Sequence, residues 1–310
     1  MGKFPEETFV ENRRIIVVGK NGVGDFTRIQ EALDNCAKEE SEVTLLILSG
    51  EYEENILLYQ SDIQLIGVGT VKIIGCNYAK QVNEKGTEIG TFQTATVFIN
   101  GENVWLENIE IINNAGPGEK AGQAIALYNE GTNNTFKRCI FRGYQDTLCL
   151  GPLPDYQKDG TPFSTPKFKK EFTRKRTTFQ NCYIEGTVDF IFGGGESVFE
   201  QCEIKSLLRP MNKEGYITAA STPKDNNGFY FNKCYLTADL DVENVYLGRP
   251  WRPFANVTFS NCIVGRHIAP SRWDDWGNTN NRQSVRFMEE NNTYLMKEPL
   301  QKLNWTYFKE

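Results

Sequence analysis

Short runs of alternating apolar and polar residues follow one another along most of the chain, and Asn and Gly residues interrupt them. The run Val257-Thr258-Phe259-Ser260 is one example. A period of two that is bounded by turn residues is typical of β-strands and not of helices. The pattern predicts further strands over 43–48, 63–66, 71–74 and 95–99.

A repeat with the pattern Phe-x-x-Cys-x-apolar organises many of these runs. An earlier copy, Trp105 to Ile109, has Asn108 in the cysteine position. A unit of about 20 residues that tolerates insertions is typical of solenoids. Parallel strands stacked coil on coil, ~4.8 Å apart, predict an all-β fold, a single-stranded right-handed parallel β-helix. The five copies, 43, 20, 32 and 28 residues apart, begin at Phe136, Phe179, Phe199, Phe231 and Phe259.

One helix is expected near the N-terminus, where apolar residues recur at helical spacing. Asp25 or Thr27 is placed to cap it. The open end of a β-helix exposes its apolar interior, so we expect this helix to cover the N-terminal end. Its apolar face consists of Phe26, Ile29, Ala32, Leu33 and Cys36.

The longest interval, between Cys139 and Cys182, contains a segment rich in Pro, Gly and Lys. We interpret 151–176 as a loop insertion, which allows the flanking coils to stack on each other. No linker divides the chain, so residues 1–310 are expected to form a single β-helix domain.

The composition excludes several classes of protein. No apolar run approaches the ~20 residues needed to span a bilayer, and the net charge of −6 argues against a general nucleic-acid binder. We therefore expect a monomer with no membrane or nucleic-acid partner. Met1-Gly2-Lys3 leads straight into polar sequence without a signal peptide, as in a mature secreted form or a cytosolic protein.

The eight cysteines in 310 residues are too few for a disulfide scaffold. No Cys-x-x-Cys pair is present, which excludes zinc-ribbon sites. Five of the cysteines occupy the repeat position and are expected to form a buried apolar stack. If the protein is exported, Cys182 and Cys202, 20 residues apart, are the pair best placed for a disulfide.

A single histidine, His267, limits the possible chemistry. Most zinc hydrolases need two or three histidine ligands. A serine hydrolase would depend entirely on His267, and the Gly-x-Ser-x-Gly elbow is absent. Gly19 to Gly24 lacks the lysine of a phosphate-binding loop and is interpreted as a turn. We interpret His267 as a surface or strand-end residue. We expect no cofactor and no metal. Carboxylate chemistry is the class of catalysis that remains.

Two aspartates stand at the same offset within the repeat. Asp146 lies seven residues after Cys139, and Asp189 lies seven residues after Cys182. If the coils stack, the two carboxylates lie close together. Paired carboxylates support acid–base and nucleophilic chemistry, although aspartates are also common in structural turns.

Five motif-like segments span most of the chain. They are Gly50 to Glu54 (GEYEE), Gly122 to Leu127 (GQAIAL), Gly143 to Leu148 (GYQDTL), Gly186 to Gly193 (GTVDFIFG) and Leu247 to Trp251 (LGRPW). In these residues and in this order the chain resembles the pectin methylesterases (pectinesterases). The fold of that family is a right-handed parallel β-helix with a shallow cleft on one face, in agreement with the repeat.

The resemblance implies hydrolysis of the methyl esters of galacturonate residues in pectin (homogalacturonan), with release of methanol. It identifies Asp189 as the nucleophile and Asp146 as the general acid and then base. Gln123 and Gln145 would stabilise the oxyanion, Arg249 would orient Asp189, and Gln123 and Arg249 would also contact the sugar. Electrostatics agrees, because Arg249 would lower the pKa of Asp189 and a like charge one coil away would raise that of Asp146.

Further substrate contacts are expected around these residues. By resemblance, Trp251 would pack against the sugar and Thr91 would contact the substrate. Tyr144 and Phe190 flank the two aspartates and would form cleft walls, unless they pack in the core. Structural alternatives stay open: an amide ladder for the two glutamines, a surface ion pair for Arg249 and core packing for Trp251.

Other functions on the same scaffold are open alternatives. They are a non-catalytic carbohydrate-binding β-helix, a pectin lyase or galacturonase, and an acyl-CoA thioesterase. Methanol release without chain cleavage would separate the esterase from the lyase and the galacturonase. The resemblance predicts pectin as the partner and a secreted, periplasmic or cell-surface location.

Two hypotheses concern the substrate. A basic run in the insertion would attract free carboxylates of partly demethylated pectin, unless it is only a solvated charge run. Arg209, seven residues after Cys202, would lie on the face of the two aspartates and contact a neighbouring galacturonate, unless the turn at Pro210 shifts the register. The basic run consists of Lys167, Lys169, Lys170, Arg174, Lys175 and Arg176.

Overall fold

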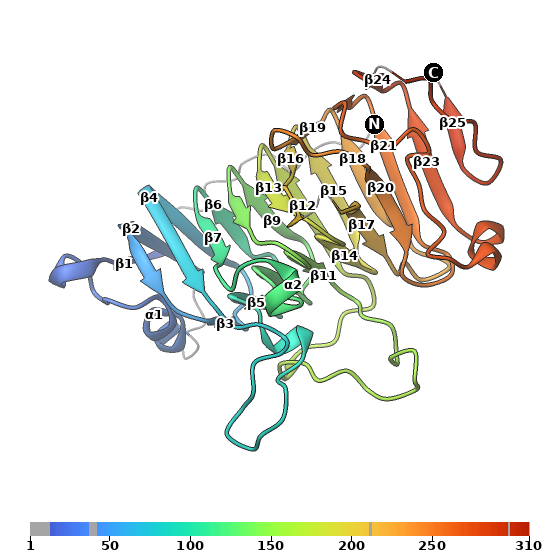
Figure 1. The fold of residues 1–310 in the computed structure, drawn as a ribbon. Coiled ribbons are helices and arrows are strands. Elements are labelled where there is room, and N and C mark those ends of the chain that lie inside the picture. The colour runs from blue at the N-terminus through green and yellow to red at the C-terminus, as the bar shows by residue number, and fades with distance from the viewer. Residues whose placement is uncertain (1–12, 37–41, 211–212, 297, 310) are drawn as a thin grey trace.

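The computed structural model describes residues 13–36, 42–210, 213–296 and 298–309. Short parallel strands stack coil upon coil from β1 (Arg14–Val18) to β25 (Tyr307–Lys309), as Figure 1 shows. Within these ranges the strands form one sheet of 18 strands and one of 7 strands. The chain therefore winds as a parallel β-helix, in agreement with the fold class predicted from the repeat.

The large sheet supplies two faces of the solenoid. Its long strand β4 pairs through its first half with β6 and through its second half with β7. From there one stack continues through β9 to β25 and the other through β10 to β24. Between β1 and β25 the strands are β2 (Val43–Glu53), β4 (Ile63–Gly75), β6 (Trp105–Glu107), β7 (Glu110–Asn113), β9 (Asn134–Lys137), β10 (Ile140–Arg142), β12 (Arg176–Gln180), β13 (Tyr183–Gly186), β15 (Glu196–Glu200), β16 (Glu203–Ser206), β18 (Phe229–Asn232), β19 (Tyr235–Ala238), β21 (Asn256–Ser260), β22 (Ile263–Val264), β23 (Arg286–Glu290) and β24 (Thr293–Tyr294).

The small sheet forms the third face of the solenoid. Its strands alternate along the chain with those of the large sheet, so that each central coil contributes one strand to each face. They are β3 (Ile56–Leu58), β5 (Val97–Ile99), β8 (Leu127–Asn129), β11 (Leu148–Leu150), β14 (Ile191–Gly193), β17 (Gly215–Ala220) and β20 (Val245–Pro250).

The predicted strands are confirmed, with one change. Strand β2 covers the predicted run 43–48, and β5 covers the end of the run 95–99. The two predicted runs 63–66 and 71–74 form one strand, β4. They join because β2 pairs with both halves of β4, across a register shift at Leu48/Gly50.

The repeated phenylalanines form a ladder in the core. Their side chains are fully buried, and successive ring centroids lie 5.0, 4.7, 4.3 and 4.4 Å apart. Ring stacking and apolar burial therefore explain why phenylalanine recurs at this position. On β9, β12, β15, β18 and β21 the matching residues are Phe136, Phe179, Phe199, Phe231 and Phe259.

The residue before each repeated cysteine turns the chain from one face of the large sheet to the other. It has a positive φ, 52° at Arg138 and at Asn181 and 55° at Asn261. Its N–H donates to a carbonyl oxygen of the next coil, as from Arg138 to Gln180 at 2.9 Å. A single left-handed residue thus makes the corner and fixes the spacing between phenylalanine and cysteine.

The earlier copy of the repeat is shifted by one residue from its predicted alignment. Leu106, and not Trp105, pairs with Phe136, and Ile109 takes the buried cysteine position. Trp105 is half-exposed and donates its indole N–H to Glu107. Because side chains alternate along a strand, a shift of one residue exchanges the inner and outer faces.

The repeated cysteines form the predicted buried stack, and their thiols are free. The disulfide considered for Cys182 and Cys202 is therefore absent. Their thiols lie 3.3 and 3.5 Å from the carbonyl oxygens of Phe136 and Phe179, to which they donate. Each of these two thiols thus has a hydrogen-bond partner within the core.

Helix α1 (Ile29–Cys36) covers the N-terminal end of the core, and four of the five residues predicted for its apolar face are fully buried there. Its first N–H groups, at Ile29 and Gln30, donate to the Glu54 carboxylate at 3.0 and 3.1 Å. Asp25, one of the two residues considered for the cap, accepts a hydrogen bond from β1 instead. Local sequence could not identify Glu54, because it lies 25 residues away from the helix start.

The insertion contains no strand. Strand β11 ends at Leu150 and β12 begins at Arg176, so the loop comprises 151–175. It projects from the same side of the solenoid as the loop that precedes β5 (Figure 1). The short helices elsewhere are η1 (Lys20–Gly22), η2 (Thr91–Gln93), α2 (Gly118–Ala121) and η4 (Thr279–Gln283).

Among the described residues, none of the helices combines the length and the apolar character needed to cross a membrane. Met1-Gly2-Lys3, on which the expectation about a signal peptide depended, lies outside the described residues. The single domain over residues 1–310 stays a prediction.

Candidate active site

A cleft of about 530 Å³ lies on the face formed by the small sheet. Strands β14, β17 and β20 contribute to its floor, and the loop before η2 and the insertion contribute to its walls. It is lined by Gly90, Thr91, Phe92, Gln123, Gln145, Asp146, Gln157, Lys158, Phe163, Ser164, Asp189, Phe192, Ala219, Arg249, Trp251, Arg252 and Trp276.

Asp146 and Asp189 occupy equivalent positions on adjacent coils of this cleft. Each lies two residues before a small-sheet strand, and the first residues of these strands, Leu148 and Ile191, pair with each other. The N–H of Asp146 donates to the carbonyl oxygen of Val188 at 3.1 Å. Both aspartates are only 8% exposed. The offset of seven residues from the cysteines therefore predicts the stacking of these two residues correctly.

Arg249 holds Asp189 with two hydrogen bonds. Its Nε and Nη2 donate to the two carboxylate oxygens of Asp189 at 2.8 and 2.7 Å. The guanidinium carbon lies 3.8 Å from the ring centroids of both Tyr216 and Trp276. A bidentate pair held by two aromatic rings fixes both the charge and the direction of the carboxylate.

The electrostatic environment shifts the pKa values of the two carboxyl groups by different amounts. Burial raises the pKa of Asp146 well above its usual range, and the neighbouring charge of Asp189 raises it further. Burial also raises the pKa of Asp189, but less, because the Arg249 guanidinium opposes the shift. Arg249 acts in the predicted direction, although burial outweighs it. The proton consequently stays on Asp146 to higher pH than on Asp189.

Gln123 and Gln145 both line the cleft, beside the two aspartates. The backbone of α2 packs against Gln145, since a Cβ added to Gly118 would lie 2.7 Å from the Gln145 Oε1. The Gln145 side chain also contributes a hydrogen bond to Asp146. Burial raises the pKa of Asp146, and this hydrogen bond lowers it. Two neutral amides are therefore available where negative charge would develop.

Thr91 and Trp251 also line the cleft. Thr91 is the first residue of η2. Trp251 directly follows β20 and is half-buried, with its ring centroid 5.8 Å from that of Phe192 and 6.0 Å from that of Phe163. Its ring therefore belongs both to an aromatic cluster and to the cleft surface.

Phe190 does not form a cleft wall but takes the alternative of core packing, whereas a cleft-wall role of Tyr144 stays a prediction. Phe190 is fully buried in the main core. It follows Asp189 directly, at the left-handed corner (φ of 48° at Asp189) that turns the chain into β14. Tyr144 is half-buried and lies outside the lining of the cleft.

Sequence reasoning missed several residues that loops bring to the cleft. Trp276 contacts Arg249, and Phe163 of the insertion packs on Phe92 with ring centroids 5.1 Å apart. Lys158 and Arg252 add two cations. The only signal for Trp276 was its place in an irregular segment with two tryptophans, Trp273 and Trp276.

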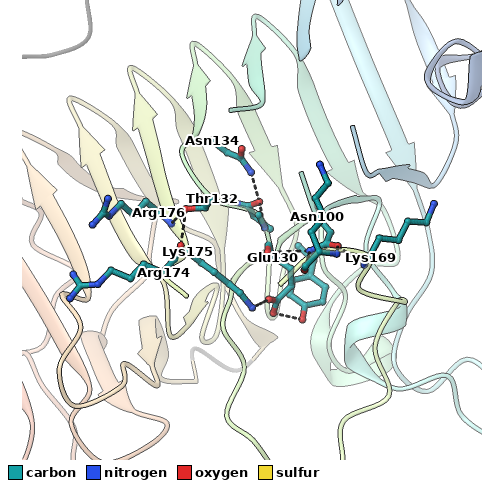
Figure 2. Close-up of polar contacts among 12 residues, drawn as sticks. Asn100, Glu130, Thr132, Asn134, Lys169, Arg174, Lys175 and Arg176 are labelled. Carbon is teal, nitrogen blue, oxygen red and sulfur yellow. Dashed lines mark hydrogen bonds and ion pairs between the residues drawn. The ribbon is translucent and has the colours of Figure 1, made fainter. Parts of the chain in front are cut away.

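The basic run of the insertion anchors the loop away from the cleft (Figure 2). Lys175 pairs with the buried Glu130. Arg174 and Arg176 both pair with Glu196, at 3.0 and 3.2 Å. None of the six predicted residues lines the cleft, and attraction of substrate by this run stays a prediction.

Asn100 holds the middle of the same run (Figure 2). Its side-chain oxygen accepts from the backbone N–H groups of Lys169 and Lys170 at 2.7 and 2.9 Å, and its amide donates to the Lys170 carbonyl oxygen at 3.0 Å. The Lys169 ammonium lies 3.7 Å from the ring centroid of Tyr59. Backbone and side chain together fix this part of the loop against the solenoid.

Arg209 acts electrostatically on Asp189 and is paired with residues outside the lining of the cleft. Burial raises the pKa of Asp189, and the Arg209 charge is among the influences that lower it. The guanidinium pairs with Glu119 of α2 at 3.0 Å and also donates to the carbonyl oxygen of Glu214. Arg209 is outside the lining of the cleft, and its contact with a neighbouring galacturonate stays a prediction.

The described residues contain no group of three or more His, Cys, Asp or Glu side chains that could hold a metal ion. His267 is buried and not on the surface, so that part of its interpretation is wrong. Burial lowers the pKa of His267 to about 4, so the ring is neutral at physiological pH. It lies outside the lining of the cleft.

The sequence matches the Pectinesterase family model over residues 15–161 and 172–310. The ten residues between the two matched segments, 162–171, fall within the insertion. Almost all of the solenoid is therefore covered by the match.

Curated relatives and solved structures agree with this match. The chain is 32% identical over 290 residues to Pectinesterase QRT1 of Arabidopsis thaliana, with 90% of this chain and 69% of that protein covered. It is 30% identical over 287 residues to Pectinesterase 31 of the same plant, with 89% of this chain and 81% of that protein covered.

The comparison with solved structures shows the same fold. Pectin methylesterase from carrot superposes with a TM-score of 0.79 at 24% identity, over 97% of this chain and 89% of that one. Pectin methylesterase from Aspergillus niger gives a TM-score of 0.75 at 26% identity, over 94% of this chain and 89% of that one. These matches support a right-handed parallel β-helix.

Proposed function

The chain belongs to the pectinesterase family, and on that basis we propose that Asp189 and Asp146 hydrolyse the methyl esters of galacturonate residues in pectin. Membership of the family makes the chain an enzyme, a pectin methylesterase. The reaction consumes water and yields methanol and a free carboxylate on the polysaccharide.

Asp189 is the nucleophile in this proposal. Its carboxylate oxygen attacks the ester carbonyl carbon, which requires the ionised form. The bidentate contact with Arg249 favours that form and aims the carboxylate. The attack converts the carbonyl oxygen into an oxyanion, next to which Gln123 and Gln145 offer amide N–H donors.

Asp146 supplies the proton that the leaving group needs. Burial raises the pKa of Asp146 further than that of Asp189, where Arg249 opposes the shift, so in this proposal Asp146 starts protonated and Asp189 ionised. Collapse of the tetrahedral intermediate breaks the bond to the methoxy oxygen, which takes the proton from Asp146 and leaves as methanol. The product of this step is an anhydride between Asp189 and the galacturonate carbonyl.

Water completes the cycle. Asp146, now ionised, accepts a proton from a water molecule that attacks the galacturonate carbonyl carbon. Cleavage of the anhydride releases Asp189 as a carboxylate and the galacturonate as a free acid, and Asp146 is again protonated. Both acids return to their starting states.

The observation that carries this proposal is the contrast between two stacked carboxyl groups, one held by two hydrogen bonds from Arg249 and the other without them, with a pKa that burial raises well above its usual range. The test measures methanol release from highly methylated pectin by the wild type, Asp189→Ala and Asp189→Asn. We expect both variants to lose at least ~10⁴-fold in kcat, since they lack the nucleophile. Asp189→Asn preserves the shape of the site beside Arg249.

Asp239→Asn serves as a matched control, because Asp239 pairs with Lys205 outside the cleft. Circular dichroism establishes that each variant is folded. Near-normal methanol release by folded Asp189→Asn would refute the assignment. Cleavage of the polysaccharide chain without methanol release would instead favour a lyase or a galacturonase.

Pectin is the proposed partner. Solved pectin methylesterases of this fold include complexes with hexasaccharides, and the cleft presents aromatic and polar side chains suited to a sugar chain. A monomeric state, an extracellular, periplasmic or cell-surface location and the absence of nucleic-acid or membrane partners stay predictions.

A further inference from the structure

Two cations line one side of the cleft and take no part in the proposed reaction. Lys158 belongs to the insertion, and Arg252 follows Trp251 directly. Lys158 Nζ lies 5.0 Å from the ring centroid of Trp276, the ring that also contacts Arg249. Trp276 therefore connects this cationic side of the cleft with the catalytic arginine.

Neither cation has an acidic partner. Within the described ranges of the chain, no carboxylate lies within ion-pair distance of Lys158 or Arg252, whereas Arg249 is fully engaged with Asp189. Lys158 is exposed, and the Arg252 guanidinium donates only to carbonyl oxygens, those of Trp251 and Tyr156, both at 3.0 Å. Positive charge is thus available to an anionic ligand in the cleft.

The insertion is held in place, so the position of Lys158 is defined by contacts. The hydrogen bond from Arg252 to the Tyr156 carbonyl oxygen joins the loop to the end of β20. Phe163 packs on Trp251 and on Phe92, across the floor of the cleft. The loop therefore presents Lys158 to the cleft from a packed base.

We infer that Lys158, assisted by Arg252, forms a subsite for the free carboxylate of a galacturonate residue adjacent to the ester being hydrolysed. This inference rests on the proposed function, since that reaction creates such carboxylates on its own substrate. A methyl ester is neutral and gains nothing from the two cations. The subsite consequently favours partly demethylated pectin over fully methylated pectin.

The subsite can be tested by binding, without turnover. Isothermal titration measures the affinity of an unesterified oligogalacturonate for the wild type, Lys158→Gln and Lys167→Gln. Lys167 is a matched control, because it is an exposed lysine of the same loop outside the cleft. We expect Lys158→Gln to weaken binding about threefold, as for one exposed ion pair, and Lys167→Gln to leave it unchanged.

High salt should remove the difference in oligogalacturonate affinity between the wild type and Lys158→Gln, because salt screens the exposed ion pair between Lys158 and the ligand carboxylate. Equal weakening by both variants would indicate a general charge effect and overturn the inference. Unchanged affinity of Lys158→Gln at low salt would overturn it as well.

Steady-state kinetics separates failure of the subsite from failure of the proposed function. Lys158→Gln should raise KM about threefold on partly demethylated pectin, with kcat unchanged, and leave KM on highly methylated pectin unaltered. Equal kinetics of Lys158→Gln and wild type on both substrates would refute the subsite while the esterase assignment stands. Absence of methanol release by the wild type would refute the proposed function itself.

Discussion

Asp146 and Asp189 share a left-handed backbone conformation, with φ of 67° and 48°, at matching positions of adjacent coils. This region is uncommon for residues other than glycine, and aspartate enters it more readily than most. The conformation turns the chain into the small-sheet strand and sets both carboxyl groups in the cleft. One backbone feature therefore accounts for the corner of the solenoid and for the pairing of the two acids.

The first prediction concerns Asp146→Asn, which should inactivate the enzyme and stabilise the fold at neutral pH. Burial raises the pKa of Asp146 well above the ordinary value, so its ionisation opposes folding as pH rises. Asparagine removes that cost because it is never charged. We expect the melting temperature to rise by roughly 2 °C or more at neutral pH, on the scale of about 1 kcal/mol.

The difference in melting temperature between Asp146→Asn and the wild type should depend on pH. Below the ordinary aspartate pKa of about 3.9 both folded and unfolded wild type are protonated, and the two proteins should melt alike. The advantage of Asp146→Asn should grow as pH rises toward the raised pKa and stay constant above it. A lower melting temperature of the variant at neutral pH would contradict the raised pKa.

The second prediction is that Arg249→Lys lowers kcat by about 10- to 100-fold, because a hydrogen bond to a charged group contributes about 1.5–3 kcal/mol. Lysine keeps the charge but loses the two-point contact with Asp189 and the stacking on Tyr216 and Trp276. Methanol release measures the effect. Arg209→Lys is the control, because this substitution also preserves a positive charge, at a residue that does not contact Asp189. Equal kcat for Arg249→Lys and wild type would show that positive charge alone suffices.

The core and the two acids could be predicted from sequence because a repeated corner fixes their spacing. Phe179 and Cys182 recur with one left-handed residue before the cysteine, Asn181, and Asp189 follows at a constant distance. Loop residues have no such register. Lys158 and Trp276 reach the cleft through tertiary packing of long irregular segments, which no period in the sequence describes.

The errors of sequence reasoning have related physical causes. Trp105 was aligned with the repeated phenylalanines, whereas strand pairing puts Leu106 in that place and turns Trp105 to the outer face. Neither interpretation of the basic run, as a substrate attractor or as a solvated charge run, included the pairing of Arg174, Lys175 and Arg176 with the distant acids Glu130 and Glu196. Partners that lie far apart in sequence leave no local signal.

The third prediction is that Gln145→Ala lowers kcat by ~10²–10³ with little change in KM, as for loss of one oxyanion donor. Gln157→Ala is a matched control, because Gln157 also lines the cleft but bonds within the insertion, to Thr161 and Pro162. We expect the control to retain kcat. A similar loss in both variants would mean that the effect comes from the shape of the cleft.

The fourth prediction is that metal chelators leave methanol release unchanged. The proposed chemistry uses the Asp189 carboxylate held by Arg249, the Asp146 proton and neutral amides, and no step requires a metal ion. Activity is measured before and after incubation with excess chelator, with a calcium-dependent enzyme treated in parallel as a control for chelation. Strong inhibition that added calcium reverses would instead favour a lyase.

The fifth prediction concerns Glu130, a buried acid that contacts the insertion (Figure 2). Its carboxylate pairs with Lys175, near the end of the loop, and accepts from the Tyr128 hydroxyl at 2.7 Å. Gly151, the first residue of the loop, passes so close that an added Cβ would lie 2.4 Å from Glu130 Oε1. The Glu130 side chain is fully buried, so water cannot replace these partners.

Glu130→Gln should destabilise the fold by about 3–5 kcal/mol, because it leaves the largely buried ammonium of Lys175 without its counter-charge. Denaturant unfolding measures the loss, and limited proteolysis should cut the variant first within 151–175. The double variant Glu130→Gln/Lys175→Met should recover part of the stability, since no buried charge is left unpaired. Lys167→Met, at an exposed position of the same loop, should change the unfolding free energy by less than about 0.5 kcal/mol. If Glu130→Gln unfolds like the wild type, the pair does not anchor the loop, and the position of Lys158 in the cleft must depend on Phe163 and Arg252 alone.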